Sequence, residues 1–146
     1  MSTLLAEDVE MTLDADGWAW TRRDAGWAVP SAGEVTREIR VIPTDDGVRL
    51  DAVLIEWDEA AAESREALAL FLKRAERDVP GVGCSLDGTL ARLSANVPAG
   101  QIECRLGEAL RSMFAGCRLL AAGARALLSP ELARQYLSFL GEKTEK

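Results

Sequence analysis

Alternating apolar and polar residues predict antiparallel strands in the middle of the chain. One hairpin joins residues 36–42 to residues 48–57 through a turn at 43–47, and a second joins 82–86 to 89–97. The strand over 48–57 places four apolar side chains on one face: Val48, Leu50, Ala52 and Leu54. Toward its end both faces become apolar through Val53, Ile55 and Trp57. We therefore expect this strand to be central and covered on both sides there.

A further hairpin is predicted between residues 18 and 29. Trp18 and Trp20 have the spacing of one face of a strand, and the turn Asp24-Ala25-Gly26 precedes the next strand. We expect Gly26 to supply a positive φ at this turn, because glycine adopts that conformation without a steric penalty. A loop at 30–33 follows.

Apolar residues spaced three and four apart predict two longer helices, over residues 58–77 and 102–128. Asp58 is expected to cap the first, whose packed face is Ala61, Leu68, Phe71, Leu72 and Ala75. The packed face of the second comprises Leu106, Leu110, Met113, Phe114, Cys117, Leu120, Ala121 and Ala124. Shorter helices are predicted over residues 3–12 and 129–140, with Ser129 as a cap and Pro130 as the first helical residue.

These elements predict a single α+β domain over residues 1–146, in which an antiparallel sheet has helices packed on it. We divide the chain into an N-terminal segment, 1–15, a core, 16–128, a short C-terminal helix, 129–140, and a frayed tail, 141–146. The residues between the elements are too few to separate two domains.

Composition and charge narrow the range of functions. Apolar residues form 48% of the 146 residues, which is typical of a globular protein, and the net charge is −7. This acidity argues against nucleic acid as a partner, because phosphate binding depends on clustered Lys and Arg. No apolar stretch is long enough to span a membrane, and the N-terminus lacks the pattern of a secretory signal. We therefore expect a cytoplasmic protein with three reduced cysteines.

Candidate catalytic and metal-binding chemistry is sparse. Histidine is absent, which excludes catalytic triads with a histidine base and every zinc site that uses imidazole. The acidic turn Asp14-Ala15-Asp16-Gly17 lacks the third ligand of a calcium loop, and Gly81-Val82-Gly83 lacks the third glycine of a dinucleotide loop. We therefore expect no catalytic residues, no metal and no cofactor, and hence no enzymatic activity.

The helix over 102–128 carries the candidate binding surface. Arg111, Arg118 and Arg125 recur every seven residues along one side, either as a solvated helix face or as a site for an acidic partner. Gly116 and Gly123 belong to a stripe of small residues that allows close approach of another backbone. That backbone belongs either to the same chain or to a second subunit.

The stripe also bears on assembly. We expect a homodimer, because the apolar and small-residue stripes together cover more of the helix than one sheet contact requires. The alternative is a monomer in which residues 130–140 fold back over the stripe, with Leu132, Tyr136 and Leu137 above Gly116 and Gly123.

Short motifs in the same order resemble the YbjN-like family, which is associated with bacterial sensory-transduction regulation. They are Asp16-Gly17-Trp18, then Leu54-Ile55-Glu56-Trp57 before the helix containing Leu68-Ala69-Leu70-Phe71-Leu72, and finally Asp87-Gly88-Thr89-Leu90. The resemblance covers about residues 10–140 and extends to the fold of class I type III secretion chaperones. It implies a non-enzymatic dimer that holds another polypeptide.

Two functions follow as hypotheses. The first is a non-enzymatic protein-interaction module with chaperone-like architecture, which holds or regulates another polypeptide. The second is a regulatory domain that binds a small molecule. An exposed patch or sheet edge would favour the first, and an enclosed pocket with converging polar groups would favour the second.

Overall fold

The computed structural model describes residues 3–30, 38–56, 62–79, 81–87 and 90–144. These described residues form six strands, four α-helices and one 3-10 turn at Ala99–Gln101. The elements are α1 (Thr3–Ala15), β1 (Thr21–Arg23), β2 (Gly26–Pro30), β3 (Glu38–Pro43), β4 (Gly47–Glu56), α2 (Ala62–Asp78), β5 (Gly83–Asp87), β6 (Leu90–Pro98), α3 (Ile102–Ala126) and α4 (Pro130–Thr144).

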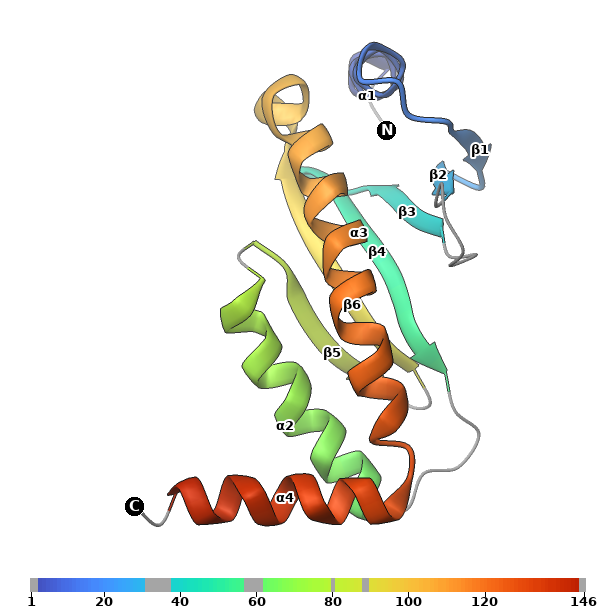
Figure 1. Cartoon of the computed structure of the whole chain (residues 1–146). Coiled ribbons are helices and arrows are strands. Elements are labelled where there is room, and N and C mark those ends of the chain that lie inside the picture. Colours follow the sequence, from blue (N-terminus) through green and yellow to red (C-terminus); the bar gives the residue numbers. More distant parts are fainter. Residues whose placement is uncertain (1–2, 31–37, 57–61, 80, 88–89, 145–146) are drawn as a thin grey trace.

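All strands belong to one antiparallel sheet in the order β1-β2-β3-β4-β6-β5. The predicted α+β class with an antiparallel sheet is confirmed. Helices α2 and α3 lie side by side on one face of this sheet, and α4 runs across the end of α2 (Figure 1). α1 packs beside the first turns of α3. The helices of the described residues thus form one layer and the strands the other.

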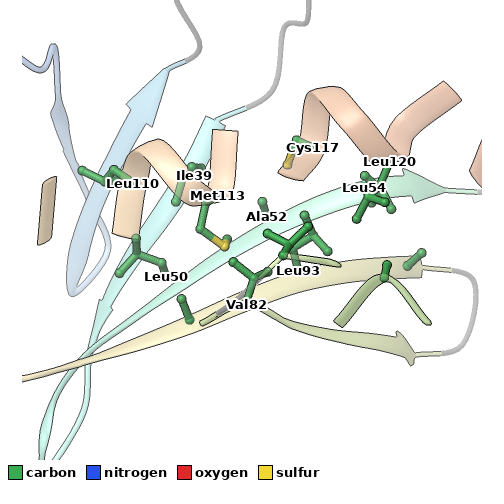
Figure 2. Packing of buried hydrophobic residues seen from close by; sticks show 14 of the residues in the cluster. Ile39, Leu50, Ala52, Leu54, Val82, Leu93, Leu110, Met113, Cys117 and Leu120 are labelled. Atoms are coloured by element: carbon green, nitrogen blue, oxygen red, sulfur yellow. The ribbon is translucent and has the colours of Figure 1, made fainter. Parts of the chain in front are cut away.

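The core lies between β4, β6 and α3. Leu50, Ala52 and Leu54 of β4 point toward Met113 and Leu120 of α3, as Figure 2 shows. The predicted packed face of α3 is confirmed, because all eight of its positions are buried in the core or half-buried against it: Leu106, Leu110, Met113, Phe114, Cys117, Leu120, Ala121 and Ala124. The apolar face that alternation gives the strands therefore packs against the apolar face that the 3.6-residue period gives the helix.

The prediction that both faces of β4 are covered toward its end is wrong. Val53 pairs with Arg92 and Ile55 pairs with Ala91, so Leu54 is an extra, unpaired residue in a β-bulge. The bulge turns Leu54 and Ile55 toward the helices together, and both are buried. Leu54 and Ile55 are therefore both apolar because the bulge places both on the helix-facing side, and not because both faces of β4 are covered. Trp57 lies outside the described residues.

The first hairpin is shorter than predicted. Trp18 and Trp20 precede β1 and do not share a strand face. Trp18 instead stacks on Phe114 of α3, with ring centroids 5.7 Å apart, and Trp20 donates a hydrogen bond to Asp14. Tertiary contacts with two helices, rather than strand alternation, therefore account for this pair of tryptophans.

The turn between β1 and β2 also differs from the prediction at one position. The positive φ falls at Asp24, at 50°, and not at Gly26. Gly26 is required for space, since a Cβ at this position would collide with the carbonyl oxygen of Val41 on β3. The glycine therefore permits the close approach of two strands.

Several helix ends are displaced from their predicted positions. α1 continues to Ala15, three residues past the predicted end, and stops at Gly17, whose φ is 77°. α4 continues to Thr144, so residues 141–144 are helical and the predicted frayed tail begins too early. Ser129 accepts a hydrogen bond from the Leu132 N–H at 3.5 Å, in agreement with its predicted cap position. Asp58, the predicted cap of α2, lies outside the described residues.

Candidate interaction surface

One face of the sheet points away from α2 and α3, and no helix of the described residues packs on it (Figure 1). We call it the open face. Strand alternation places charged and polar side chains there, because the intervening residues fill the core. Its central residues are Glu38, Arg40 and Ile42 of β3, Arg49, Asp51, Val53 and Glu56 of β4, and Arg92, Ser94 and Asn96 of β6.

The centre of the open face is hollowed. The hollow has a volume of about 600 Å³ and opens to solvent across three strands. Its lining contains three arginines, three carboxylates and two aliphatic side chains: Glu38, Arg40, Ile42, Arg49, Asp51, Val53, Glu56 and Arg92. This arrangement is a shallow polar depression and not an enclosed apolar pocket.

Asp51 lies at the middle of the hollow. Its carboxylate accepts a hydrogen bond from Arg92 Nη1 at 2.8 Å, and the Asp51 side chain is only 11% exposed. Arg40 lies directly across from Asp51 in the strand register. The Asp51–Arg92 ion pair thus lies in a nearly buried setting, where it is stronger than in bulk water, and the strand register brings a second arginine next to Asp51.

Both of these arginines retain unused hydrogen-bonding capacity. The Nε atoms of Arg40 and Arg92 are buried and have no hydrogen-bond partner among the described residues. The recorded ion pair of Arg40 is to Asp24, at 3.4 Å, and the Asp24 side chain is 90% exposed. Such an exposed pair is weak, because solvent screens it.

Two further charges of the hollow lack an ion pair with any described residue. Arg49 is exposed, and its cross-strand neighbours, Ile42 and Asn96, are uncharged. Glu56, at the opposite end of β4, lies across from Leu90. The hollow therefore presents a positive end near Arg49 and a negative end near Glu56.

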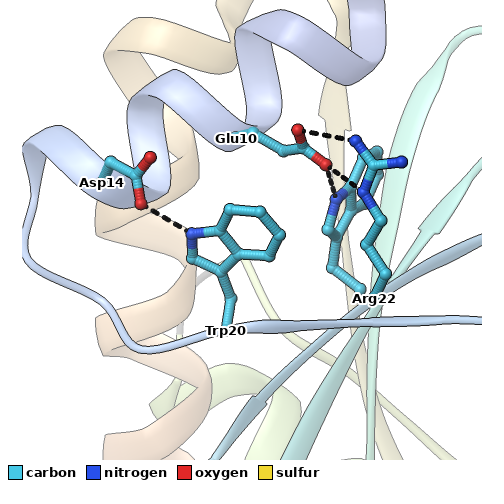
Figure 3. A network of polar contacts seen from close by, with 5 residues as sticks. Glu10, Asp14, Trp20 and Arg22 are labelled. Atoms are coloured by element: carbon cyan, nitrogen blue, oxygen red, sulfur yellow. Dashed lines mark hydrogen bonds and ion pairs between the residues drawn. The ribbon is translucent and has the colours of Figure 1, made fainter.

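A separate polar network attaches the first hairpin to α1. Glu10 accepts two hydrogen bonds from Arg22, at 2.7 and 2.9 Å, and one from Trp27 Nε1, at 2.9 Å. Asp14 accepts one from Trp20, so two carboxylates of one helix hold the hairpin (Figure 3). The hydrogen bonds from Arg22, and then the one from Trp27, hold the pKa of Glu10 below its usual value. This network is fully satisfied and serves to position the hairpin.

The five predicted site residues all lie on α3, with the arginines exposed and the two glycines buried or half-buried. Arg111, Arg118 and Arg125 are exposed on α3 and make no ion pair with another described residue. A Cβ on Gly116 would lie 3.3 Å from Leu93, and one on Gly123 would lie 2.8 Å from Phe71.

Within the small-residue stripe, the same chain therefore supplies the close neighbours of both glycines. The C-terminal helix does not fold back over them, since α4 packs mainly on α2. The sequence allowed the backbone near this stripe to belong to the same chain or to a second subunit. For Gly116 and Gly123, the close neighbours belong to the same chain.

A second, smaller groove of about 190 Å³ runs between α2 and the edge strand β5. Glu76 of α2 accepts a hydrogen bond from the Cys84 N–H at 2.8 Å, which satisfies an outward-facing group of the sheet edge. Burial, and secondly the negative charges of Glu76 and Cys117, raise the pKa of the Cys84 thiol to about 11. Cys84 is therefore a poor nucleophile at neutral pH.

Other site chemistry is limited in the part of the chain that the structure describes. No group of three His, Cys, Asp or Glu residues there has the arrangement of a metal site. Nor does that part contain a helix with the length and apolarity needed to cross a membrane.

Sequence reasoning missed the open face, although the polar phase of each strand was visible. The alternation placed Arg92, Ser94 and Asn96 together, but the pairing of β4 with β6 joins strands separated by a helix and another strand. A cross-strand ion pair such as Asp51–Arg92 depends on that pairing and has no local sequence signal.

Comparison with known proteins gives one informative match. No family model matches the chain, and no curated protein matches it in sequence. Among solved structures, the fold is similar to the crystal structure of YbjN from E. coli, described as "a putative transcription regulator", with a TM-score of 0.56 and 14% sequence identity. The match covers 81% of this chain and 92% of that one. The YbjN-like fold predicted from the sequence motifs is thereby confirmed.

Proposed function

We propose that this protein is a non-enzymatic, cytoplasmic interaction module with chaperone-like architecture, which holds or regulates another polypeptide. The observation that carries the proposal is the open face, where a complete layer of the sheet presents charged side chains to solvent. Solubility alone does not require the low exposure of Asp51, at 11%, or two arginine Nε atoms that have no acceptor among the described residues. Unpaired buried donors are costly unless an acceptor arrives.

The structural neighbour supports a regulatory role in general terms. YbjN is described as "a putative transcription regulator", and its fold is similar to that of this chain over most of both chains. Regulation by a chain with a net charge of −7 is more readily explained by contact with protein than by contact with nucleic acid.

A small-molecule regulatory domain is the second candidate. The size of the hollow, about 600 Å³, lies within the range of ligand sites, and three arginines line it. Its open form is the argument against this candidate, because a small ligand there would remain exposed on one side.

Purification of the tagged protein from its native cell, under mild conditions, separates the two candidates. A polypeptide in stoichiometric amount supports the interaction module, and a bound metabolite with no polypeptide supports the regulatory domain. A variant with Asp51→Asn and Arg92→Gln removes both charges of the central ion pair. We expect it to lose the polypeptide, whereas Arg105→Gln on the exposed side of α3 should retain it.

A further inference from the structure

The positive end of the hollow is formed by two arginines on adjacent strands. Arg40 lies across from Asp51, and Arg49 lies across from Ile42, so the two arginines are diagonal neighbours on the open face. Asp51 is already engaged by Arg92, and Asp24, which pairs with Arg40 at 3.4 Å, has a side chain that is 90% exposed. Arg40 and Arg49 therefore provide positive charge that the described residues leave largely uncompensated, and an incoming oxyanion would reduce their mutual repulsion.

The negative end lies further along β4. Glu56 follows Arg49 by seven residues, one of which is the extra residue of the bulge. Six extended steps give a separation of about 20 Å between the two ends. Val53 lies between them on the same face, and Ile42 adds a second aliphatic surface beside Arg49.

On this geometry, and resting on the function proposed above, we propose that the hollow binds an extended acidic segment of the partner polypeptide. Two carboxylates on alternate residues of that segment, which share one face of an extended chain, bind Arg49 and Arg40. A basic residue about six positions along the segment reaches Glu56 and sets its direction. An extended chain advances about 3.3 Å per residue, so six residues match the separation of the two charged ends.

The dimensions and the overall charge favour a polypeptide over a small anion. A free phosphate or dicarboxylate would contact only the positive end, whereas an extended peptide reaches from the positive end of the hollow to the negative end. The net charge of −7 repels acidic ligands in general. If an acidic peptide binds this protein, the binding must therefore come from a local positive site, because the net charge of the protein does not attract the peptide.

The test is fluorescence anisotropy with a labelled ten-residue peptide of otherwise neutral sequence, in which two glutamates stand at alternate positions and the first of them precedes an arginine by six positions. A second peptide has the two kinds of charge exchanged. Arg49→Gln is the principal variant, since Arg49 has no ion pair among the described residues that its loss would break. Arg105→Gln is the matched control, because Arg105 is equally exposed but lies on α3.

We expect the first peptide to bind the wild type, Arg49→Gln to weaken binding about tenfold or more, and the control to change it less than twofold. Glu56→Gln should reduce discrimination between the two peptides. The proposal is overturned if the wild type binds neither peptide at low salt, if both arginine variants behave alike, or if inorganic phosphate displaces the peptide at equal concentration.

Failure here is distinguishable from failure of the proposed function. If the native partner co-purifies with Arg49→Gln as well as with the wild type, the partner uses another surface and only this inference fails. If no polypeptide co-purifies with the wild type, the interaction module itself is wrong.

Discussion

At the scale of single residues, the three cysteines show how one side-chain type takes on different reactivity in one fold. Cys104 is exposed on α3, Cys84 is half-buried on β5, and Cys117 is buried in the core. Reactivity depends on both access and the fraction of thiolate, and burial limits both. The odd number of thiols and their separate surroundings also agree with the expectation that they remain reduced.

We predict that a thiol reagent at pH 8 modifies Cys104 first and Cys84 much more slowly. With a pKa of about 11, only about one Cys84 side chain in a thousand is a thiolate at that pH. Cys117 should react only on unfolding, because its side chain lies in the core. Mass spectrometry of peptides over time measures the order. Glu76→Gln should speed the reaction at Cys84 modestly, and rapid labelling of Cys84 in the wild type would contradict the raised pKa.

A second residue-scale prediction concerns Gly116. A Cβ there would lie 3.3 Å from Leu93 and 3.5 Å from Val79, so a leucine has no room without displacement of the core. Gly116→Leu should lower the free energy of unfolding by about 1–3 kcal/mol or more, measured by urea denaturation. Gly141→Leu is the control, since nothing lies within 4 Å of a Cβ at that position. Equal stability of the two variants would contradict the packing of α3 on β6.

At the scale of elements, the sequence predicted all four helices and the hairpins of β3 with β4 and of β5 with β6. Local periodicity was sufficient there, because the packed faces of these elements are regular. Periodicity gave wrong predictions at two places, where a tertiary contact or an extra residue in a strand sets the position of the side chains. Trp18 packs on a helix 96 positions later in the chain, and Leu54 breaks the alternation of β4. The open-face site depends on strand order, which no local pattern encodes.

The attachment of the first hairpin to α1 depends on pH through Glu10. Its pKa is lowered in the folded state, so the stabilisation is complete above the usual value of 4.5 and is lost as pH falls through the lowered value. Glu10→Gln should therefore destabilise the protein more at pH 7 than at pH 3, because protonation in acid removes the Glu10 charge that Arg22 and Trp27 stabilise. Urea denaturation at the two pH values measures this. A difference that is constant with pH would contradict the role of the Glu10 charge.

Phe71 connects α2, α3 and α4. Its ring lies over Gly123 and meets Tyr136 edge to face, with centroids 6.3 Å apart. The ring is only partly buried, so Phe71→Ala should cost about 2 kcal/mol, less than the 3–5 kcal/mol of a fully buried aromatic ring. A double-mutant cycle with Tyr136→Leu should show coupling of about 0.5–1.5 kcal/mol. Additive effects would show that α4 is held by other contacts.

At the scale of the whole molecule, the homodimer stays a prediction. The argument for it now rests on exposed apolar side chains and no longer on the glycine stripe. The glycine stripe is occupied within the chain, whereas two of the most exposed apolar side chains, Leu119 of α3 and Phe139 of α4, are 67% and 51% exposed. Sedimentation at micromolar concentration should give a species of about twice 15.8 kDa. A single species near 15.8 kDa would contradict the dimer, and Leu119→Glu would then leave sedimentation unchanged.

The bulge in β4 has a consequence for how the length of this protein can vary. Removal of Leu54 would leave Val53 on the open face, Ile55 toward the helices and Glu56 on the open face, which is a strict alternation. If the bulge is kept, removal of Ala52, two residues earlier, would shift Asp51 into the core and reverse every residue before it. Of these two single-residue deletions in one strand, one thus preserves both surfaces of the sheet and the other inverts half of the strand. Length changes compatible with this fold are therefore expected at one position of β4.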